Sequence, residues 1–116
     1  MNKLKLQELN RKLVVWAGLR FYDPCIVFDG DQNCYEAPDF TNDFNACIKW
    51  LVPLLNDRGF GIYRLIQHSF HSFGVELGVL TYQGTIERYM DGIYAAVNRE
   101  PALALCLAII KLVEVK

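Results

Sequence analysis

The stretch Phe73-Gly74-Val75-Glu76-Leu77-Gly78-Val79-Leu80 decides the fold, because bulky apolar residues alternate along it with small or polar ones. A period of two is typical of a β-strand that packs one face against a core. Working outward, Phe60–Gln67 is predicted as the partner strand, joined to the first through a turn over His68–Ser72. Gly92–Asn98 is predicted as a third strand, whose inward residues are Ile93, Ala95 and Val97.

Apolar residues at helical spacing predict helices on both sides of these strands. The first helix is outlined by Leu6, Leu9, Leu13 and Trp16, and Gly18 is expected to end it. A second helix is expected to begin near Asp39 or Thr41, because either side chain can cap free N–H groups. Its apolar residues are Phe44, Ile48, Leu51 and Leu55, with an expected kink at Pro53 and an end at Gly59.

The last helix is predicted over Ala102–Val115, with Pro101 as a suitable first residue. Apolar residues surround it on every side, and a small sheet covers only one side of a helix. We therefore expect this helix to bury its remaining surface in a homodimer or a larger homo-oligomer. Together the elements predict an α/β (α+β) fold: a three-layer α/β/α sandwich with a small, mainly antiparallel sheet and three helices.

Length and composition set limits on domain number and function. The chain has 116 residues, which predicts one domain over residues 1–116, and 53% of the residues are hydrophobic. The longest stretch without Asp, Glu, Lys or Arg is Leu65–Val75, only 11 residues, so we expect no membrane span. The net charge of −1 provides no global field that would attract a nucleic acid duplex.

Acidic residues are concentrated in residues 21–48, which contain six acids and no Lys or Arg. Within this region, Cys25–Phe28 and Cys34–Glu36 are predicted as two short strands around the turn residues Asp29-Gly30-Asp31. One interpretation is an acidic loop that leads into the positive end of a helix. The other is a surface for a cation or for a basic partner protein. The long connection Phe21–Asp39 is itself a candidate site, because connections of this length are often functional.

No motif indicates a metal centre, a cofactor or a catalytic group. Asp29-Gly30-Asp31-Gln32-Asn33 begins like a calcium loop, but Cys34 and Phe40 stand where an EF-hand needs glycine and glutamate. His68 and His71 are expected in a solvated turn rather than on a helix. The four cysteines lack zinc-ligand spacing and are expected to be free thiols, with Cys47 and Cys106 buried. We therefore expect no enzyme activity and no metal.

A set of arginines and tyrosines accompanies the predicted strands. Guanidinium and phenol groups can bind phosphates and stack on bases, so these residues are candidates for binding a small anionic ligand. They are equally compatible with the edge of an ordinary sheet. The candidate ligand-binding residues are Tyr63, Arg64, Tyr82, Arg88 and Tyr89, with Tyr94 nearby.

Three blocks of the sequence resemble the phage ABA sandwich domain family. The central block is PDFTNDFNACIKWLVP at 38–53, the upstream block is LNRKL at 9–13 with WAG at 16–18, and the C-terminal block is PALALCLAI at 101–109. The resemblance implies a phage or prophage origin and an α/β/α sandwich, and it implies no activity. Asp23-Pro24-Cys25 and the later turn at Asp29-Gly30 depart from the family pattern, so no site in that loop is carried over from it.

The resulting functional hypothesis is a non-enzymatic phage or prophage accessory protein in the cytoplasm of a bacterial host. It would counter host defence by sequestering a small anionic, nucleotide-type signal or by binding a host protein. The alternative is a structural or assembly role as a homo-oligomer without a ligand. An enzyme is a third hypothesis.

Overall fold

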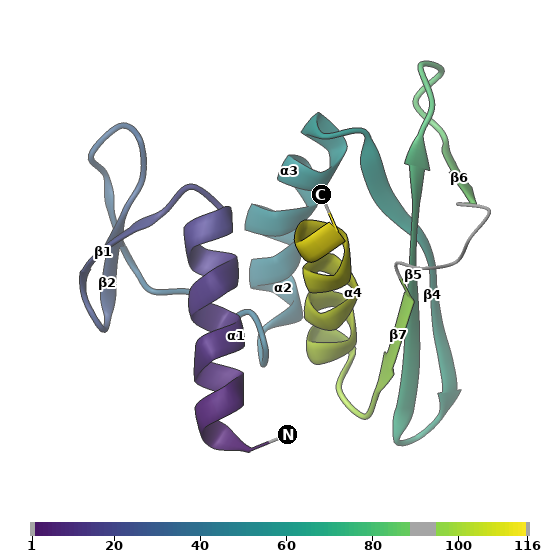
Figure 1. Ribbon diagram of the computed structural model, residues 1–116, viewed down its shortest axis with the longest axis horizontal. Coiled ribbons are helices and arrows are strands. Elements are labelled where there is room, and N and C mark those ends of the chain that lie inside the picture. The colour runs from purple at the N-terminus through teal and green to yellow at the C-terminus, as the bar shows by residue number, and fades with distance from the viewer. Residues whose placement is uncertain (1, 89–94, 116) are drawn as a thin grey trace.

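The alternating stretch forms the central strand of a four-stranded antiparallel sheet. In the computed structural model, which describes residues 2–88 and 95–115, this strand is β5 (Ser72–Leu80). It pairs on one side with β4 (Phe60–Ser69) and on the other with β6 (Ile86–Arg88) and β7 (Ala95–Asn98) (Figure 1). Val75 and Leu77 are buried, as the alternation predicted. The turn between β4 and β5 contains only Phe70 and His71, so His68 lies on a strand rather than in the turn.

The predicted orientation of the last strand is wrong in part. Ala96 pairs with Val75 and is buried, whereas Val97 pairs with Gly74 and is 62% exposed. The pairing register with β5 decides this, because a shift of one residue moves every side chain to the opposite face. Ile93 and the side chain of Ala95 lie outside the described residues. The sequence also did not predict β6 as a strand.

The predicted first and last helices are confirmed. Helix α1 (Lys3–Trp16) begins after Asn2, whose side chain accepts a hydrogen bond from Lys5 N at 2.8 Å, and Gly18 follows its end with a φ of +83°. Helix α4 (Pro101–Val115) begins at the expected proline. None of the helices in the described parts of the chain combines the length and the apolar character that a bilayer crossing requires.

The middle helical segment begins later than the sequence suggested. Asp43, rather than Asp39 or Thr41, caps it, because its carboxylate accepts a hydrogen bond from Ala46 N at 3.2 Å. The segment comprises α2 (Phe44–Ala46), a π-helical turn η1 (Cys47–Leu51) and α3 (Val52–Asp57). The wider turn lies immediately before Pro53, which cannot donate a backbone hydrogen bond. The predicted kink at Pro53 is thus realised as a change of helix type.

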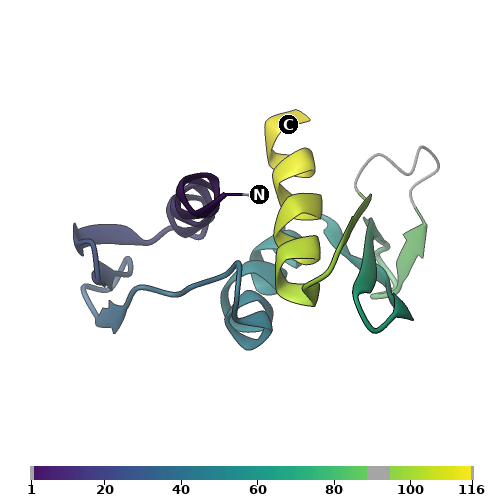
Figure 2. The same cartoon turned by 90° about the horizontal axis from the view of Figure 1, so that it is seen from below.

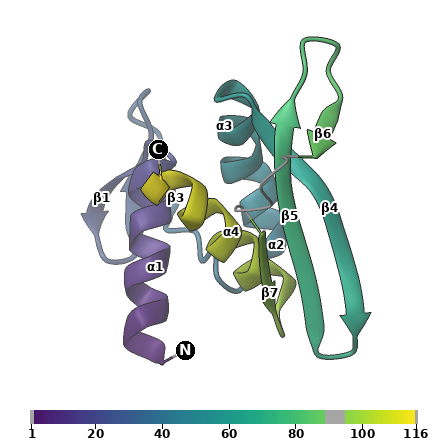
Figure 3. The same cartoon turned by 45° about the vertical axis from the view of Figure 1, so that its right-hand side comes forward.

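A second, three-stranded antiparallel sheet fills most of the long connection. It contains β1 (Arg20–Asp23), which the sequence did not predict, together with β2 (Ile26–Phe28) and β3 (Cys34–Glu36), which it did. The helices lie between the two sheets, with α1 beside the small sheet and α4 beside the large one (Figure 2). All labelled helices lie on one side of β4 and β5 (Figure 3). The α+β class, the antiparallel sheet and the three helical segments are confirmed. The predicted α/β/α layer order is wrong: the layers follow the order sheet, helices, sheet, because the connection at 20–36 forms a second sheet on the far side of the helices (Figure 2).

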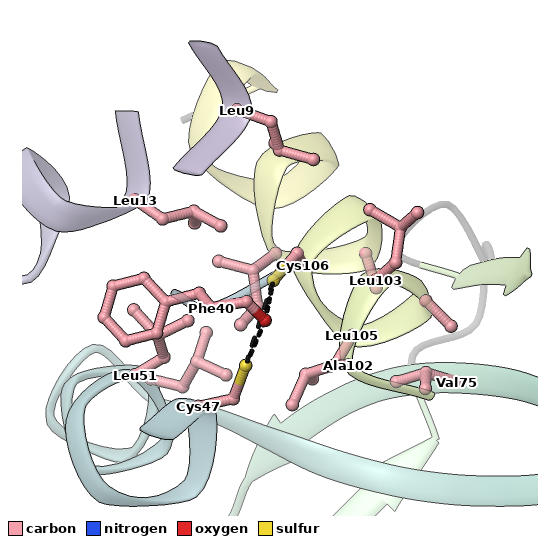
Figure 4. Close-up of a cluster of buried hydrophobic side chains, with 14 of the residues drawn as sticks. Leu9, Leu13, Phe40, Cys47, Leu51, Val75, Ala102, Leu103, Leu105 and Cys106 are labelled. Carbon is pink, nitrogen blue, oxygen red and sulfur yellow. Dashed lines mark hydrogen bonds between the residues drawn. The ribbon is translucent and has the colours of Figure 1, made fainter. Parts of the chain in front are cut away.

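The core lies where α1, the middle helical segment and α4 meet. Phe40, Leu51 and Leu105 are fully buried there, and Leu13 of α1 packs into the same cluster (Figure 4). Leu112 of α4 is also buried, at 3% exposed. Helix α4 is therefore covered by α1, η1, β5 and β7 of its own chain. The reason for expecting self-association through α4 is weakened, because most of its apolar surface is covered within the chain, with Leu107, Ile110 and Val113 half-buried.

Candidate functional site: an acid-lined groove beside residues 37–43

Of the predicted arginine and tyrosine set, the structure describes the side chains of Tyr63, Arg64 and Tyr82. Tyr63 and Arg64 are neighbours on β4, where Tyr63 is 40% exposed. Tyr82 is 97% exposed in the turn between β5 and β6. Arg88 ends β6 with its backbone paired to Gly78, and its side chain, like Tyr89 and Tyr94, lies outside what the structure describes.

Arg64 is already paired with an acid. Its Nη2 atom lies 3.3 Å from Oε1 of Glu76, whose side chain is only 9% exposed. The adjoining hollow has a volume of about 110 Å³ and is also lined by Ile66 and His68. An anion entering it would meet the Glu76 carboxylate as closely as the guanidinium. The geometry at Arg64 therefore favours a structural ion pair over an anion site.

The segment from Ala37 to Phe40 leads from β3 of the small sheet towards the middle helical segment and is firmly held. The side chain of Asn10 on α1 binds this segment at two points. Its Nδ2 donates to Pro38 O at 3.0 Å, and its Oδ1 accepts from Phe40 N at 2.7 Å. The Phe40 ring is fully buried. Its carbonyl oxygen accepts hydrogen bonds from the thiols of Cys47 at 3.1 Å and Cys106 at 3.2 Å (Figure 4). These contacts fix the segment to the core.

Two grooves run along this segment and share Ala37, Pro38 and Asp39 as lining residues. The larger, of about 580 Å³, lies between α1 and the small sheet, and Phe21 and Asp23 contribute to its wall. The smaller, of about 460 Å³, lies between β3 and the start of the middle helical segment. Concave surfaces with a few converging polar groups are the usual places where proteins bind ligands or peptides. We refer to the two hollows together as the acidic groove.

Four carboxylates line the acidic groove, against the two cationic side chains of Arg11 and Lys49. Three of the acids also accept local hydrogen bonds, Asp23 and Asp43 from backbone N–H groups and Asp39 from neighbouring side chains. Asp23 accepts from Cys25 N and Ile26 N at 2.7 and 2.9 Å. Asp39 accepts from Thr41 Oγ1 at 3.0 Å and Asn42 Nδ2 at 2.9 Å, and Asp43 caps the helix. The fourth acid is Glu36, which is exposed on β3.

Trp50 lines the smaller hollow, and Tyr35 packs against Trp50. The rings of Tyr35 and Trp50 meet edge to face, with their centroids 5.1 Å apart. The ammonium group of Lys49 lies 5.2 Å from the Trp50 ring and 5.9 Å from the Tyr35 ring. A cation over aromatic faces, close to carboxylates, is a favourable arrangement. The chain's own lysine thus shows that this aromatic pair can hold a cationic side chain.

In the turn that begins like a calcium loop, the first carboxylate, that of Asp29, accepts hydrogen bonds from neighbouring residues of the same hairpin. Asp29 accepts hydrogen bonds from Asp31 N at 2.8 Å, Asn33 N at 3.0 Å and the Tyr35 hydroxyl at 3.0 Å. The bond from Asn33 N contributes most to lowering the pKa of Asp29, while the bond to Asp29 raises the pKa of Tyr35. Among the described residues, no group of three His, Cys, Asp or Glu side chains is placed to hold a metal ion.

The four cysteines fall into two classes. Cys25 and Cys34 are exposed, whereas Cys47 and Cys106 are buried, as predicted, with their sulfur atoms 3.8 Å apart. The hydrogen bond with Cys47, reinforced by burial, raises the pKa of the Cys106 thiol well above its ordinary value. A thiol held in its neutral form is a poor nucleophile. The role of the two thiols is therefore structural: both donate hydrogen bonds to the carbonyl oxygen of Phe40.

Sequence reasoning found the acidic connection but missed Asn10, Lys49 and Trp50. Asn10 left a signal, because it is a polar residue on the inward side of α1, next to Leu9 and Leu13. The sequence contains no such signal for Lys49 and Trp50, because their position beside Tyr35 depends on how η1 packs against β3. Comparisons with protein-family models, curated proteins and solved structures return no match. The site must therefore be interpreted from its own geometry.

Proposed function

We propose that this chain is a non-enzymatic binding protein whose acidic groove holds a basic segment of a partner protein. The observation that carries the proposal is the ammonium of Lys49, which lies over the Trp50 and Tyr35 rings beside a hollow that Trp50, Glu36, Asp39 and Asp43 line. A lysine or arginine of a partner would find the same aromatic faces and the same negative charge. The fixed segment 37–40 keeps the groove preorganised, which reduces the entropic cost of binding.

The charge distribution favours this partner over the small anion that the sequence also suggested. The acidic groove has four carboxylates against two cationic groups, so it repels phosphates and attracts basic side chains. At the other predicted site, Arg64 is paired with Glu76. Of the two ligands expected for an accessory protein, the host protein is therefore better supported. A phage or prophage origin and a location in the bacterial cytoplasm remain part of this proposal on the sequence resemblance.

The test measures binding of a fluorescein-labelled octapeptide of alternating lysine and arginine by fluorescence anisotropy. Removing two groove charges with Glu36→Gln and Asp39→Asn should raise the Kd about fivefold to tenfold at roughly 50 mM salt. Lys49→Ala should lower the Kd, because it vacates the aromatic rings and removes a competing positive charge. The effects should shrink as salt is added.

The matched control removes the same charge elsewhere. Asp57→Asn with Glu87→Gln changes two exposed acids, at the end of α3 and on β6, outside the acidic groove. This variant should bind the peptide like the unsubstituted protein. Equal weakening by both double variants would show non-specific attraction and overturn the proposal. So would an unchanged Kd in the groove variant when its melting temperature is unchanged.

A further inference from the structure

Helix α1 presents a regular outward face that its own chain leaves uncovered. Leu4, Glu8, Arg11 and Val15 are all exposed and recur at intervals of four, three and four residues. This spacing places them in one stripe along a helix, as at the seam of a coiled coil. Leu4 is 65% exposed and Val15 is 60% exposed, which is unusual for two apolar residues at the two ends of one stripe. We call this stripe the α1 face.

An apolar groove adjoins the C-terminal end of the α1 face. It lies between α1 and α4, has a volume of about 670 Å³, and is walled by Val15, Trp16, Ile110 and Val113. The ion pair between Lys12 Nζ and Glu114 Oε1, at 3.7 Å, lies at its rim. The view in Figure 2 shows α1 and α4 side by side beyond the small sheet, with α4 extending past α1. The groove is thus open to a side chain that approaches along the α1 face.

We propose that the α1 face binds the α1 face of a second copy of this chain, with the two helices antiparallel. In that arrangement, residue 4 of one copy meets residue 15 of the other, and residue 8 meets residue 11. Each Leu4 would pack on the partner copy's Val15 and enter the apolar groove beside it. Each Glu8 would face the partner copy's Arg11. A two-fold axis makes every contact twice, as an isologous interface requires.

Charge complementarity selects a second copy over other occupants. The stripe carries one acid and one base, placed symmetrically about its midpoint, so antiparallel copies pair opposite charges, whereas parallel copies in register would place like charges together. The guanidinium of Arg11 lies 5.1 Å from the centre of the Phe21 ring. The ion pairs Lys12–Glu114 and Arg64–Glu76 use neither Glu8 nor Arg11.

This interface differs from the one that the sequence suggested. The apolar residues of α4 are buried inside the chain, and only Ile110 and Val113 reach the groove. Arg11 also lines the acidic groove, whereas Leu4, Glu8 and Val15 do not, so the Glu8 variant tests the dimer separately from the proposed binding function.

The first experiment exchanges the two charges and measures mass by light scattering and sedimentation equilibrium. The unsubstituted protein should give twice 13.3 kDa. Glu8→Arg alone and Arg11→Glu alone each place like charges together twice, and each should raise the dimer Kd about tenfold or more. The double variant restores opposite charges and should return the Kd to within about threefold of the original.

The second experiment tests the register by cross-linking in a Cys25→Ser, Cys34→Ser background. Leu4→Cys with Val15→Cys should give a disulfide-linked dimer on mild oxidation with oxidised glutathione, which accepts the two electrons as the thiols lose their protons. The two positions lie about 16 Å apart along one helix, so they cannot bond within a chain. Leu4→Cys alone is the control and should give no cross-linked dimer above background.

A monomeric mass at several hundred micromolar would overturn the proposal. A dimer that is indifferent to the single charge reversals, or that the double variant does not restore, would also overturn it. Circular dichroism of each variant establishes that it is folded, and a variant that unfolds is replaced by Glu8→Gln or Arg11→Gln, for which a smaller rise in Kd is expected. Efficient cross-linking of Leu4→Cys alone would show a different register and reject the antiparallel pairing.

Discussion

At the scale of single residues, the two glycines of β5, Gly74 and Gly78, leave space that neighbouring groups of the large sheet occupy. A Cβ atom at Gly78 would collide with the carbonyl oxygen of Glu87 and would lie 2.9 Å from atoms of Tyr63 and Ile86. A Cβ atom at Gly74 would lie 2.7 Å from Nε2 of His68, the far end of a side chain that can rotate. The two glycines therefore differ. The space beside Gly78 is occupied by the backbone of Glu87, whereas the space beside Gly74 is occupied by the imidazole of His68.

This difference predicts unequal costs for the same substitution. Gly78→Ala should destabilise the protein by about 3 kcal/mol, because backbone must move to relieve the clash. Gly74→Ala should cost less than about 1 kcal/mol, because His68 can adopt another rotamer. Urea unfolding measures both values. Gly30→Ala is the control, since nothing lies within 4 Å of its added Cβ, and similar losses at positions 74 and 78 would contradict the explanation.

At the scale of elements, α4 shows how a helix that is apolar on all sides can bury most of its surface within a small chain. The sequence indicated a helix without a polar side, and the structure surrounds it with α1, η1, β5 and β7. Leu105 lies fully buried at the centre of this packing. An element that is apolar on all sides therefore need not signal an oligomer interface. It can equally form the middle layer of a fold.

The burial of α4 predicts a loss of stability without a change in association. Leu105→Ala should destabilise the chain by about 3 kcal/mol, through lost apolar burial and the cavity left behind. Its mass by light scattering should equal that of the unsubstituted protein. Val97→Ala is the control, because this side chain is 62% exposed, and it should change stability by less than about 0.5 kcal/mol. A folded Leu105→Ala protein with altered mass would place α4 in an interface after all.

At the scale of the whole molecule, the segment around Phe40 connects the acidic groove to the core. The thiols of Cys47 and Cys106, which come from two helical segments, both donate to its carbonyl oxygen. Asn10 of α1 holds the same segment from the other side. Because these partners are far apart in the sequence, opening this region requires the helices to separate. We therefore expect the groove wall and the core to unfold together.

Cysteine labelling tests this cooperativity. In native conditions, N-ethylmaleimide should modify Cys25 and Cys34 within minutes and leave Cys47 and Cys106 intact, because the latter are buried and the pKa of the Cys106 thiol is raised. With rising urea, the buried pair should become reactive along the same transition as the circular dichroism signal. Mass spectrometry of the labelled peptides assigns the sites. Labelling of Cys47 before the main transition would show that the groove wall opens separately from the core.

The sequence by itself determined the elements that depend on local pattern. Alternation at 73–80 specified β5, helical spacing specified α1 and α4, and the turn residues Asp29-Gly30-Asp31 located the hairpin of β2 and β3. It also identified the acidic connection as a candidate site. Periodicity and turn chemistry act over a few neighbouring residues, so they can be recognised without knowledge of the fold.

Only the tertiary structure decided the relations between distant residues. The register of β7 placed Val97 outward, η1 placed Lys49 over Tyr35 and Trp50, and the packing of α4 removed its apolar surface from solvent. The register of β4 on β5 placed Arg64 opposite Glu76 and gave it an acidic partner. These features depend on which surfaces meet when the helices pack between the two sheets. Such long-range choices minimise exposed apolar area and unpaired charge for the whole chain, and no short segment carries that information.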